Sequence, residues 1–469
     1  MFKKATLTLF VICFLLLGFV ASADPDFGWH LVCGNRILEG QSWCLDNHFS
    51  YYLTNYKFYN PSFIFDILLA LFYRIGGFVG AGILGSLIFA GTAILFTKAL
   101  PKKVPQAIGF VGFLAVFFLS GQIFDLGVRS QLASFWFSLL FLYFLQKLSE
   151  RKVPLWVFPL AMVFWVNSHG GFFLGLVLLG FYAVAQVIQR TKEVKRSLAT
   201  LASTFAATLI NPFTYKVYVE LVRHFNAPLN TTIAEWVSPP LLHRMIIFFV
   251  VAGLLGWLAF WWYRRRSAWE IFIALIVVFF AALAITARRN LPFFYIFAIY
   301  SFLYYLPWKW PEKKDWLTVF VALPLLFLGF KKAEKALAFN TNWEKYCNEG
   351  ASRYPCAVVK KYPNLQGNVF NTYEWGGFLI WQWPEAKVFI DGRMPAWMDD
   401  YNSSTYETWL YILQTRPGWE KILEQYQTTH LLIGNGVFLD LLLQERGVEF
   451  GWQELYRDEQ AAFYGKISQ

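Results

Sequence analysis

Charged residues are scarce in this sequence. Only 15% of its 469 residues are Asp, Glu, Lys or Arg, and 57% are hydrophobic. Soluble domains carry roughly 25% charged residues. Apolar runs of about 17 to 22 residues recur along the chain, which is the length that a helix needs to cross a bilayer. The composition therefore argues against an ordinary soluble protein and predicts a polytopic helical membrane protein.

Nucleotide-binding motifs are also missing. The chain has no GxxxxGK[ST] loop, no GxGxxG after a predicted strand and no GxSxG elbow, so an ATPase, a dinucleotide enzyme and an α/β-hydrolase are disfavoured. The five cysteines show no spacing typical of a zinc site. Four of them form two local pairs, Cys33 with Cys44 and Cys347 with Cys356, and we predict a disulfide in each pair in an oxidising compartment.

Eleven apolar segments are predicted to cross the membrane. They are 5–22, 78–97, 105–121, 131–147, 154–168, 171–189, 197–211, 244–263, 268–286, 291–307 and 315–330. Alternate connections are rich in Lys and Arg, and the positive-inside rule makes that side cytoplasmic. The net charge of +11 therefore reports topology in a multi-pass protein of the cytoplasmic (inner) membrane, and nucleic acid is not an expected partner.

The N-terminus has two interpretations. Lys3 and Lys4, the apolar run and Ala21-Ser22-Ala23 also fit a cleavable signal peptide. A retained helix is favoured because the run is long enough to span. The outer face then receives a first loop, 23–60, and all residues after the last span. Residues 61–75 are apolar but too short to cross, so we expect an interfacial helix, or else a broken start to the second span.

The two predicted domains are a membrane domain, 1–330, and an extracytoplasmic domain, 331–469. In the second domain short strands alternate with helices, which predicts a small soluble α/β domain with a partly parallel sheet. The strands are expected at 367–371, 387–391, 430–433, 453–456 and 461–464, and the helices at 374–383, 404–414, 419–425 and 437–445.

An acidic segment follows the first span directly. Asp24 and Asp26 flank Pro25, and His30 comes four residues later. Proline favours an extended residue before it, and residues two apart in an extended segment point the same way. Asp24 and Asp26 are therefore expected to aim at one divalent metal or one reacting hydroxyl. The alternative is a polar turn that only ends the first helix.

Other polar residues lie at predicted outer ends of spans. His169 lies with Gly170 and Gly171 in a short turn between two predicted spans. We expect it to bind a phosphate or a carboxylate there, or else only to cap a helix end. Arg288 and Arg289 precede an outer helix start and form a plausible phosphate clamp, or else bind lipid headgroups. Arg129 and Glu235 are weaker candidates.

Short motifs follow one another along nearly the whole chain, at residues 24–30 with Gly34, 46–50, 128–131, 165–171, 211–212, 235–236, 288–293, 373–377 and 390–393. In this order they resemble the motifs of bacterial multi-span proteins grouped with the GT-C glycosyltransferase superfamily. The superfamily uses polyprenyl-phosphate sugars and has an acidic motif in its first outer loop. Many members have adjacent acids, whereas proline separates Asp24 and Asp26 here.

The resemblance implies a membrane glycosyltransferase with a GT-C-like bundle of about eleven transmembrane helices. Asp26 is expected to accept the proton of an acceptor hydroxyl, and Asp24 to orient it or hold Mg or Mn. Arg288 and Arg289 would stabilise the departing lipid phosphate. His30, His169, Arg129 and Glu235 would bind substrate or phosphate.

The expected partners are the bilayer, a polyprenyl-phosphate-linked sugar and a glycan, lipid or protein acceptor. We expect the first-loop acids, His169 and an arginine to line one cavity open to the outer leaflet. Two alternatives remain: a non-enzymatic envelope scaffold or transport component, and a glycan ligase or polymerase using a diphosphate-linked donor.

Overall fold

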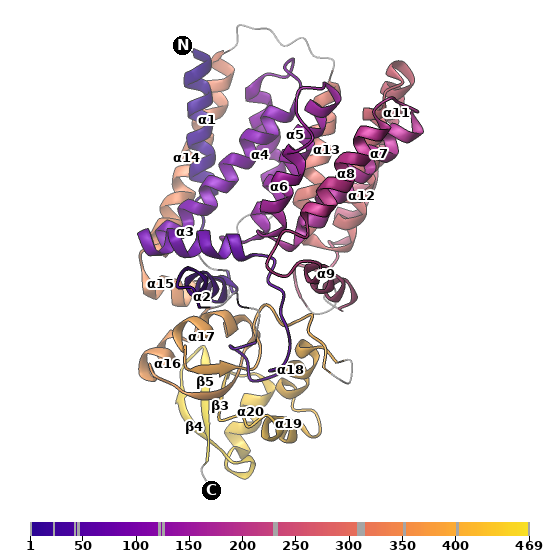
Figure 1. The fold of residues 1–469 in the computed structure, drawn as a ribbon. Coiled ribbons are helices and arrows are strands. Elements are labelled where there is room, and N and C mark those ends of the chain that lie inside the picture. Colours follow the sequence, from indigo (N-terminus) through magenta and orange to yellow (C-terminus); the bar gives the residue numbers. More distant parts are fainter. Residues whose placement is uncertain are drawn as a thin grey trace. The chain divides into compact units, whose positions relative to one another are not determined.

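The computed structural model describes residues 2–21, 24–41, 44, 47–120, 123, 127–227, 233–306, 315–349, 353–399 and 403–467. The chain divides into two compact units, both of which collect segments from distant parts of the sequence. The first unit contains residues 1–21, 81–215 and 230–337, and the second contains residues 22–80, 216–229 and 338–469. Each unit is described by itself below, and Figure 1 labels their elements.

The first unit is helical. Its helices are α1 (Phe2–Gly18), the later part of α3 (Phe63–Ala99), α4 (Gln106–Leu119), α5 (Gln131–Ser149), α6 (Val157–Val166), α7 (Phe173–Ile188), α8 (Val194–Ala207), α11 (Leu241–Arg265), α12 (Ala268–Thr286), α13 (Leu291–Tyr305) and α14 (Asp315–Asn340). Aromatic rings fill its core; Phe280, for example, stacks on Phe293 and on Phe297.

Every predicted span coincides with one of these helices. Within the described residues, five helices are both long and apolar enough to cross a membrane: Phe63–Ala99, Gln131–Ser149, Gly170–Ile188, Leu241–Arg265 and Ala268–Thr286. The helices were therefore predicted correctly, whereas the count of eleven spans is not confirmed and stays a prediction.

The second unit contains an α/β core. Its helices are α2 (Phe27–Leu38), the start of α3, α9 (Lys216–Asn226), α15 (Trp343–Glu349), α16 (Cys356–Lys361), α17 (Gly376–Gln382), α18 (Thr405–Leu413), α19 (Trp419–Gln425) and α20 (Phe438–Arg446). Its strands are β1 (Gly367–Asn371), β2 (Ala386–Val388), β3 (His430–Gly434), β4 (Trp452–Arg457) and β5 (Ala461–Lys466). The strand order is β2-β1-β3-β5-β4. The first three strands are parallel and the last two antiparallel to their neighbours, which confirms the partly parallel sheet.

The first loop extends this sheet. Val388 of β2 donates its N–H to the carbonyl of Phe49 and accepts the N–H of Tyr51, at 2.9 and 3.2 Å. Residues 49–51 therefore pair with the β2 edge, although they lie more than 300 positions earlier in the chain. Pairing of this kind covers an edge strand that would otherwise expose unpaired backbone groups.

Helix α2 packs closely on α17 within the same unit. A Cβ on Gly28 would overlap the carbonyl of Gly377, and a Cβ on Gly377 would overlap the carbonyl of Pro25. Only glycine permits so close an approach of two backbones. The acidic segment is therefore built into the fold of the α/β unit.

Both predicted disulfides are present. The Cα atoms of Cys33 and Cys44 lie 5.7 Å apart, and those of Cys347 and Cys356 lie 5.9 Å apart. Cys13 is free and buried. The two cysteine pairings predicted from the sequence are therefore confirmed.

Helix α3 contains an interruption. Gly76 and Gly77 leave the helical conformation, and Gly77 has a φ of +56°, which favours glycine. The helical part before this kink matches the predicted segment 61–75. Its interfacial location stays a prediction, as do the domain limits 1–330 and 331–469.

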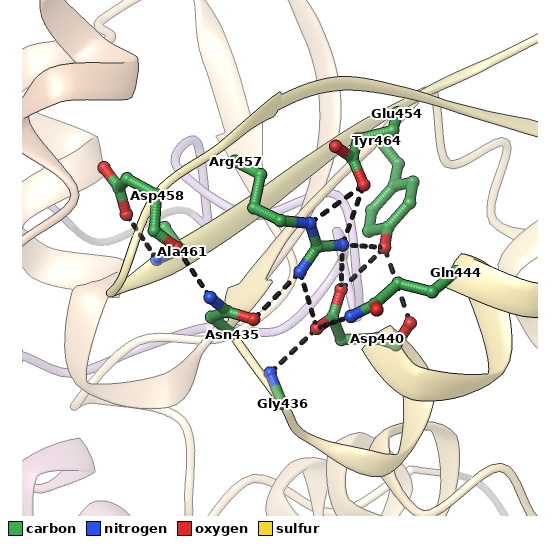
Figure 2. Close-up of polar contacts among 9 residues, drawn as sticks. All are labelled: Asn435, Gly436, Asp440, Gln444, Glu454, Arg457, Asp458, Ala461 and Tyr464. Carbon is green, nitrogen blue, oxygen red and sulfur yellow. Dashed lines mark hydrogen bonds and ion pairs between the residues drawn. The ribbon is translucent and has the colours of Figure 1, made fainter.

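A polar network ties α20 to the outer strands of the sheet (Figure 2). Asp440 accepts Arg457 Nη1 and Nη2 at 3.0 and 2.8 Å, the Tyr464 hydroxyl at 2.6 Å and the Gly436 N–H at 2.8 Å. Arg457 also donates to Glu454 and Asn435. Every N–H group of this guanidinium is therefore engaged.

Candidate functional site

The acidic segment forms a turn before α2. Asp24 accepts the Asp26 N–H through Oδ1 at 2.8 Å, and its carbonyl accepts the Phe27 N–H at 3.0 Å. Asp26 has helical backbone angles, φ −84° and ψ −10°. The extended conformation predicted here is therefore wrong, because the Asp24 carboxylate closes an Asx turn.

The two acids have different surroundings. Asp24 is buried, and its side chain holds the turn. Asp26 is half-buried, and its carboxylate has no hydrogen-bond or ion-pair partner within the described ranges. The Asp24 side chain is therefore used within the turn, whereas the Asp26 carboxylate is partly exposed.

The Asp26 carboxylate lies against the turn of residues 391–393. A Cβ on Gly392 would overlap Asp26 Oδ1, so the glycine makes room for the acid. Asp391 accepts Arg393 Nε through Oδ1 at 2.8 Å and Nη2 through Oδ2 at 2.7 Å, and both side chains are fully buried. This bidentate pair fixes the turn.

Aromatic rings surround the Arg393 guanidinium. The ring centroids of Phe49, Trp397, Phe58 and Trp29 lie 4.9 to 5.9 Å from its Cζ atom. Such rings favour a cation electrostatically. Arg393 Nη1 is nevertheless buried without a hydrogen-bond partner in the described chain.

His30 lies one helical turn after Asp26. Its Nδ1 and Asp66 Oδ1 are 2.5 Å apart, and Asn60 Nδ2 donates to Asp66 Oδ2 at 2.7 Å. The imidazole also stacks on Trp29, with ring centroids 3.6 Å apart. His30 was a predicted site residue, but Asp66 and Asn60 were not.

Three of the predicted residues in the first unit come together. Arg129 Nη2 and Glu235 Oε1 form an ion pair of 2.8 Å. The Arg289 N–H donates to the Glu235 carbonyl at 3.0 Å, and its guanidinium lies 4.4 Å from the Trp236 ring centroid. Arg288 has an exposed side chain and donates its N–H to the Val237 carbonyl at 3.1 Å.

The charge of this cluster is set by the arginines. Burial would raise the pKa of Glu235, but the positive charges of Arg129 and Arg289 and the hydrogen bond from Arg129 outweigh burial and lower the pKa. Glu235 is therefore an anion at neutral pH. One carboxylate near two guanidinium groups leaves the cluster positive, as an anion site requires.

His169 is held by its Nδ1 atom. The Gly171 N–H and the Ser134 hydroxyl reach Nδ1 at 2.9 and 2.7 Å, and Trp165 Nε1 donates to the same hydroxyl at 2.8 Å. A backbone N–H can only donate, so Nδ1 is an acceptor. The neutral imidazole therefore carries its proton on Nε2, which makes that atom a hydrogen-bond donor.

A divalent metal has limited support from the side chains. Within the described residues, no group of three or more His, Cys, Asp or Glu gathers as a metal site. Asp24 Oδ1 accepts a backbone N–H. Neither carboxylate oxygen of Asp26 has a hydrogen-bond partner among the described residues. Mg²⁺ often uses only one or two carboxylates and several waters, so these two acids fit such an ion.

The predicted site residues thus fall into two groups. Asp24, Asp26 and His30 belong to the second unit; Arg129, His169, Glu235, Arg288 and Arg289 belong to the first. The single cavity expected for both groups stays a prediction. Sequence reasoning missed Asp66 and Ser134, which lie in the apolar helices α3 and α5, and Asn60, which lies just before α3. A single polar residue in such a segment gives no signal of its partner.

No protein-family model matches the chain, and no curated protein matches it in sequence. Solved structures do match. The archaeal oligosaccharyltransferase AglB from Archaeoglobus fulgidus, in complex with an inhibitory peptide and a dolichol-phosphate, has a TM-score of 0.59 at 13% identity over 96% of this chain and 71% of that chain. The same organism's oligosaccharyltransferase with Zn and sulfate has a TM-score of 0.52 at 14% identity, over 98% of this chain and 73% of that one.

ArnT from Cupriavidus metallidurans, bound to undecaprenyl phosphate, has a TM-score of 0.52 at 13% identity. That match covers 100% of this chain and 98% of ArnT. The chain therefore has a GT-C-like membrane fold, as the sequence motifs predicted. At these identities the likeness establishes the fold, and activity has to be argued from the residues.

Proposed function

We propose that this chain with a GT-C-like fold is a membrane glycosyltransferase that moves a sugar from a polyprenyl-phosphate carrier to an extracytoplasmic acceptor. The observation that carries the proposal is the likeness of the whole chain to two transferases solved with a lipid phosphate, dolichol-phosphate in AglB and undecaprenyl phosphate in ArnT. The positive cluster supports it, as does the Asp26 carboxylate, which has no hydrogen-bond or ion-pair partner in the part of the chain that the structure describes.

The donor phosphate is assigned to the arginines of the first unit. Arg288 and Arg289 bind the phosphate and stabilise the negative charge that builds on it as the sugar leaves. Arg129 and Glu235 hold the loop that carries Arg289, through the ion pair and the backbone contact described above. His169 is assigned to the same phosphate because its Nδ1 accepts the Gly171 N–H, so the proton of the neutral ring lies on Nε2.

The acceptor is assigned to the second unit. As an acceptor oxygen bonds to the anomeric carbon, the bond between that carbon and the phosphate oxygen breaks. Asp26 takes the hydroxyl proton in this step. A divalent cation such as Mg²⁺ or Mn²⁺, held by Asp26 and Asp24, would supply positive charge near the acceptor oxygen. The two disulfides support an oxidising, extracytoplasmic location for this unit.

The test is turnover of labelled polyprenyl-phosphate sugars by the purified full chain in liposomes. The wild type should release sugar from at least one carrier in a hexose and pentose panel. Asp26→Asn should lower turnover about 10²-fold or more and leave binding of polyprenyl phosphate unchanged. Arg289→Gln should weaken carrier binding itself.

Arg74→Gln is the matched control for Arg289→Gln. Arg74 is half-exposed and pairs with Glu39 at 2.7 Å in the second unit, so its loss should leave carrier binding and turnover near wild type. The proposal is wrong if the wild type neither binds polyprenyl phosphate nor consumes any sugar of the panel.

A further inference from the structure

Helix α9 turns its charged side inward and its apolar side outward. Glu220 is only 3% exposed, whereas Phe225 is 59% exposed. Val219 and Val222 are exposed as well, and the three apolar residues follow one another at intervals of three, which places them along one stripe of the helix. A surface helix of a soluble domain has the opposite pattern, because its apolar stripe faces the core. A continuous exposed stripe of this kind marks a contact with a protein or with a membrane.

Polar contacts fix the rotation of α9. Arg223 Nη1 donates to the Lys57 carbonyl of the first loop at 3.1 Å, and the Arg223 Cζ atom lies 4.5 Å from the ring centroid of Tyr56. Arg223 Nη1 also lies 3.4 Å from Glu220 Oε2. All four residues belong to the second unit. Turning the apolar stripe inward would break these contacts, so its outward position is part of the fold of this unit.

The start of α3 shows the same arrangement in the same unit. The Asp66 side chain is fully buried, whereas Leu68, Leu71 and Ile75 are exposed, the last of them by 86%. Their spacing of three and four residues again defines one helical face. Two helices of one unit thus bury a carboxylate and expose an apolar stripe. Single apolar residues scattered over a protein surface do not explain an arrangement that occurs twice.

The course of the chain places a membrane segment close to these helices. The start of α3 continues through Gly76 and Gly77 into the rest of a helix that is long and apolar enough to cross a membrane. Six positions along the chain lead from Lys57, which contacts α9, to Phe63, where α3 begins. Six residues extend over at most about 22 Å. The contact between α9 and the first loop therefore lies within that distance of the start of α3.

Basic side chains flank the stripe of α9. Lys216 is exposed and Arg223 is partly exposed, and a spacing of seven residues, about two turns, puts them on the same side of the helix. Apolar residues on one face with Lys or Arg beside them are typical of helices that lie between lipid headgroups and acyl chains. The positive charges complement the phosphates of the headgroups. The stripe and its basic flank therefore fit one partner, the bilayer.

We propose that α9 lies in the surface of the bilayer, with Val219, Val222 and Phe225 at the boundary between headgroups and acyl chains. Together with the start of α3 it holds the second unit on the membrane. The proposal does not rest on the proposed function, because it concerns only the lipid contact of this unit. A second copy of the chain or another protein on the same stripe is a different outcome, which the test separates from lipid.

The test places the environment-sensitive fluorophore NBD on the stripe of the full chain in liposomes. The label is attached to Val222→Cys and, as the matched control, to Val448→Cys, since Val448 is an exposed valine of the same unit outside both helices. Cys13 is buried, so the wild type treated with the same reagent is the blank. Phospholipids with a nitroxide close to the headgroup should quench the Val222 probe at least about twofold and leave the Val448 probe unchanged.

Two results of this experiment would overturn the proposal. A Val222 probe that emits as it does in water, and that the nitroxide lipids do not quench, shows that the stripe faces solvent. A probe whose emission is shifted to the blue without quenching by the lipids shows that a protein covers the stripe. That protein is a second copy of the chain if the shift depends on the number of chains per liposome.

Hydrogen exchange gives an independent measurement. Phe225→Glu should raise the exchange rate of the α9 amides in liposomes at least about tenfold, because a carboxylate disfavours the apolar boundary and frees the helix from lipid. Phe438→Glu is the matched control, since Phe438 is an exposed phenylalanine on α20 of the same unit, and it should leave the exchange of α9 unchanged. Equal exchange of α9 in the wild type and in Phe225→Glu would contradict the proposal.

Discussion

Two aspartate–arginine pairs of the second unit differ in how completely they are satisfied. In the Asp440–Arg457 network each guanidinium N–H has an acceptor (Figure 2). The Arg457 side chain is also partly exposed to water. The Asp391–Arg393 pair is fully buried in aromatic rings, and Nη1 has no partner in the described chain. The complete network joins α20 to β4 and β5, whereas the incomplete pair borders Asp26. Among the described residues, a buried donor without an acceptor therefore lies beside an acid without a hydrogen-bond partner, on the side of the unit where the acceptor site is proposed.

The largest effect is expected for Asp391→Asn. It leaves the buried Arg393 guanidinium without an anionic partner, which costs about 3–5 kcal/mol of unfolding free energy. Thermal and denaturant unfolding of the purified full chain would measure it. Asp440→Asn is the matched control and should cost clearly less, because Arg457 keeps Glu454 and Asn435. Equal losses of unfolding free energy in the two variants would show that the two aspartate–arginine pairs do not differ in their contribution to stability.

Gly392→Ala should have the next largest effect. Its Cβ must displace the Asp26 carboxylate, at a cost of about 1–3 kcal/mol for overpacking, and turnover should fall at least tenfold. Gly434→Ala is the control, since its Cβ would meet only Val437 Cγ1 at an ordinary 3.5 Å. Asp26→Ala removes the obstacle, so Gly392→Ala should no longer destabilise the chain in that background. A persistent loss there would mean that Asp26 is not what the Cβ meets.

Asp440→Asn should cost about 1.5 kcal/mol, the low end for a hydrogen bond to a charged group, and the loss should depend on pH. Burial would raise the pKa of Asp440, but the hydrogen bonds from Arg457, Tyr464, Gly436 and Gln444 outweigh it and lower the pKa. The stabilisation is therefore complete above the ordinary aspartate pKa of about 3.9 and is lost as the pH falls further. Melting temperatures from pH 7 to pH 2.5 should converge for wild type and variant; a constant gap would contradict this.

The smallest effect is expected for Glu454→Gln. Glu454 is 43% exposed where it meets Arg457, and solvent-exposed ion pairs contribute little. The unfolding free energy should change by less than about 0.5 kcal/mol, with salt reducing even that. A larger loss would show that the Glu454–Arg457 ion pair stabilises the fold more than its exposure suggests.

The sequence determined the local features of this protein. Long apolar runs form helices because a helix satisfies its own backbone in an apolar setting, so each predicted span corresponds to a helix. Short strands alternating with helices predicted the sheet of the second unit, and cysteines nine and eleven residues apart predicted both disulfides. Each of these depends on neighbours in the chain.

Only the tertiary structure decided which polar residues meet. The sequence does not indicate that Glu235 pairs with Arg129, that Asp66 orients His30 or that Gly392 lies against Asp26. It also predicted an extended acidic segment, whereas the Asp24 carboxylate folds it into a turn. Hydrophobic periodicity fixes which face of an element is buried. The meeting of polar side chains depends on how distant backbones approach, and that approach is set by packing over the whole unit.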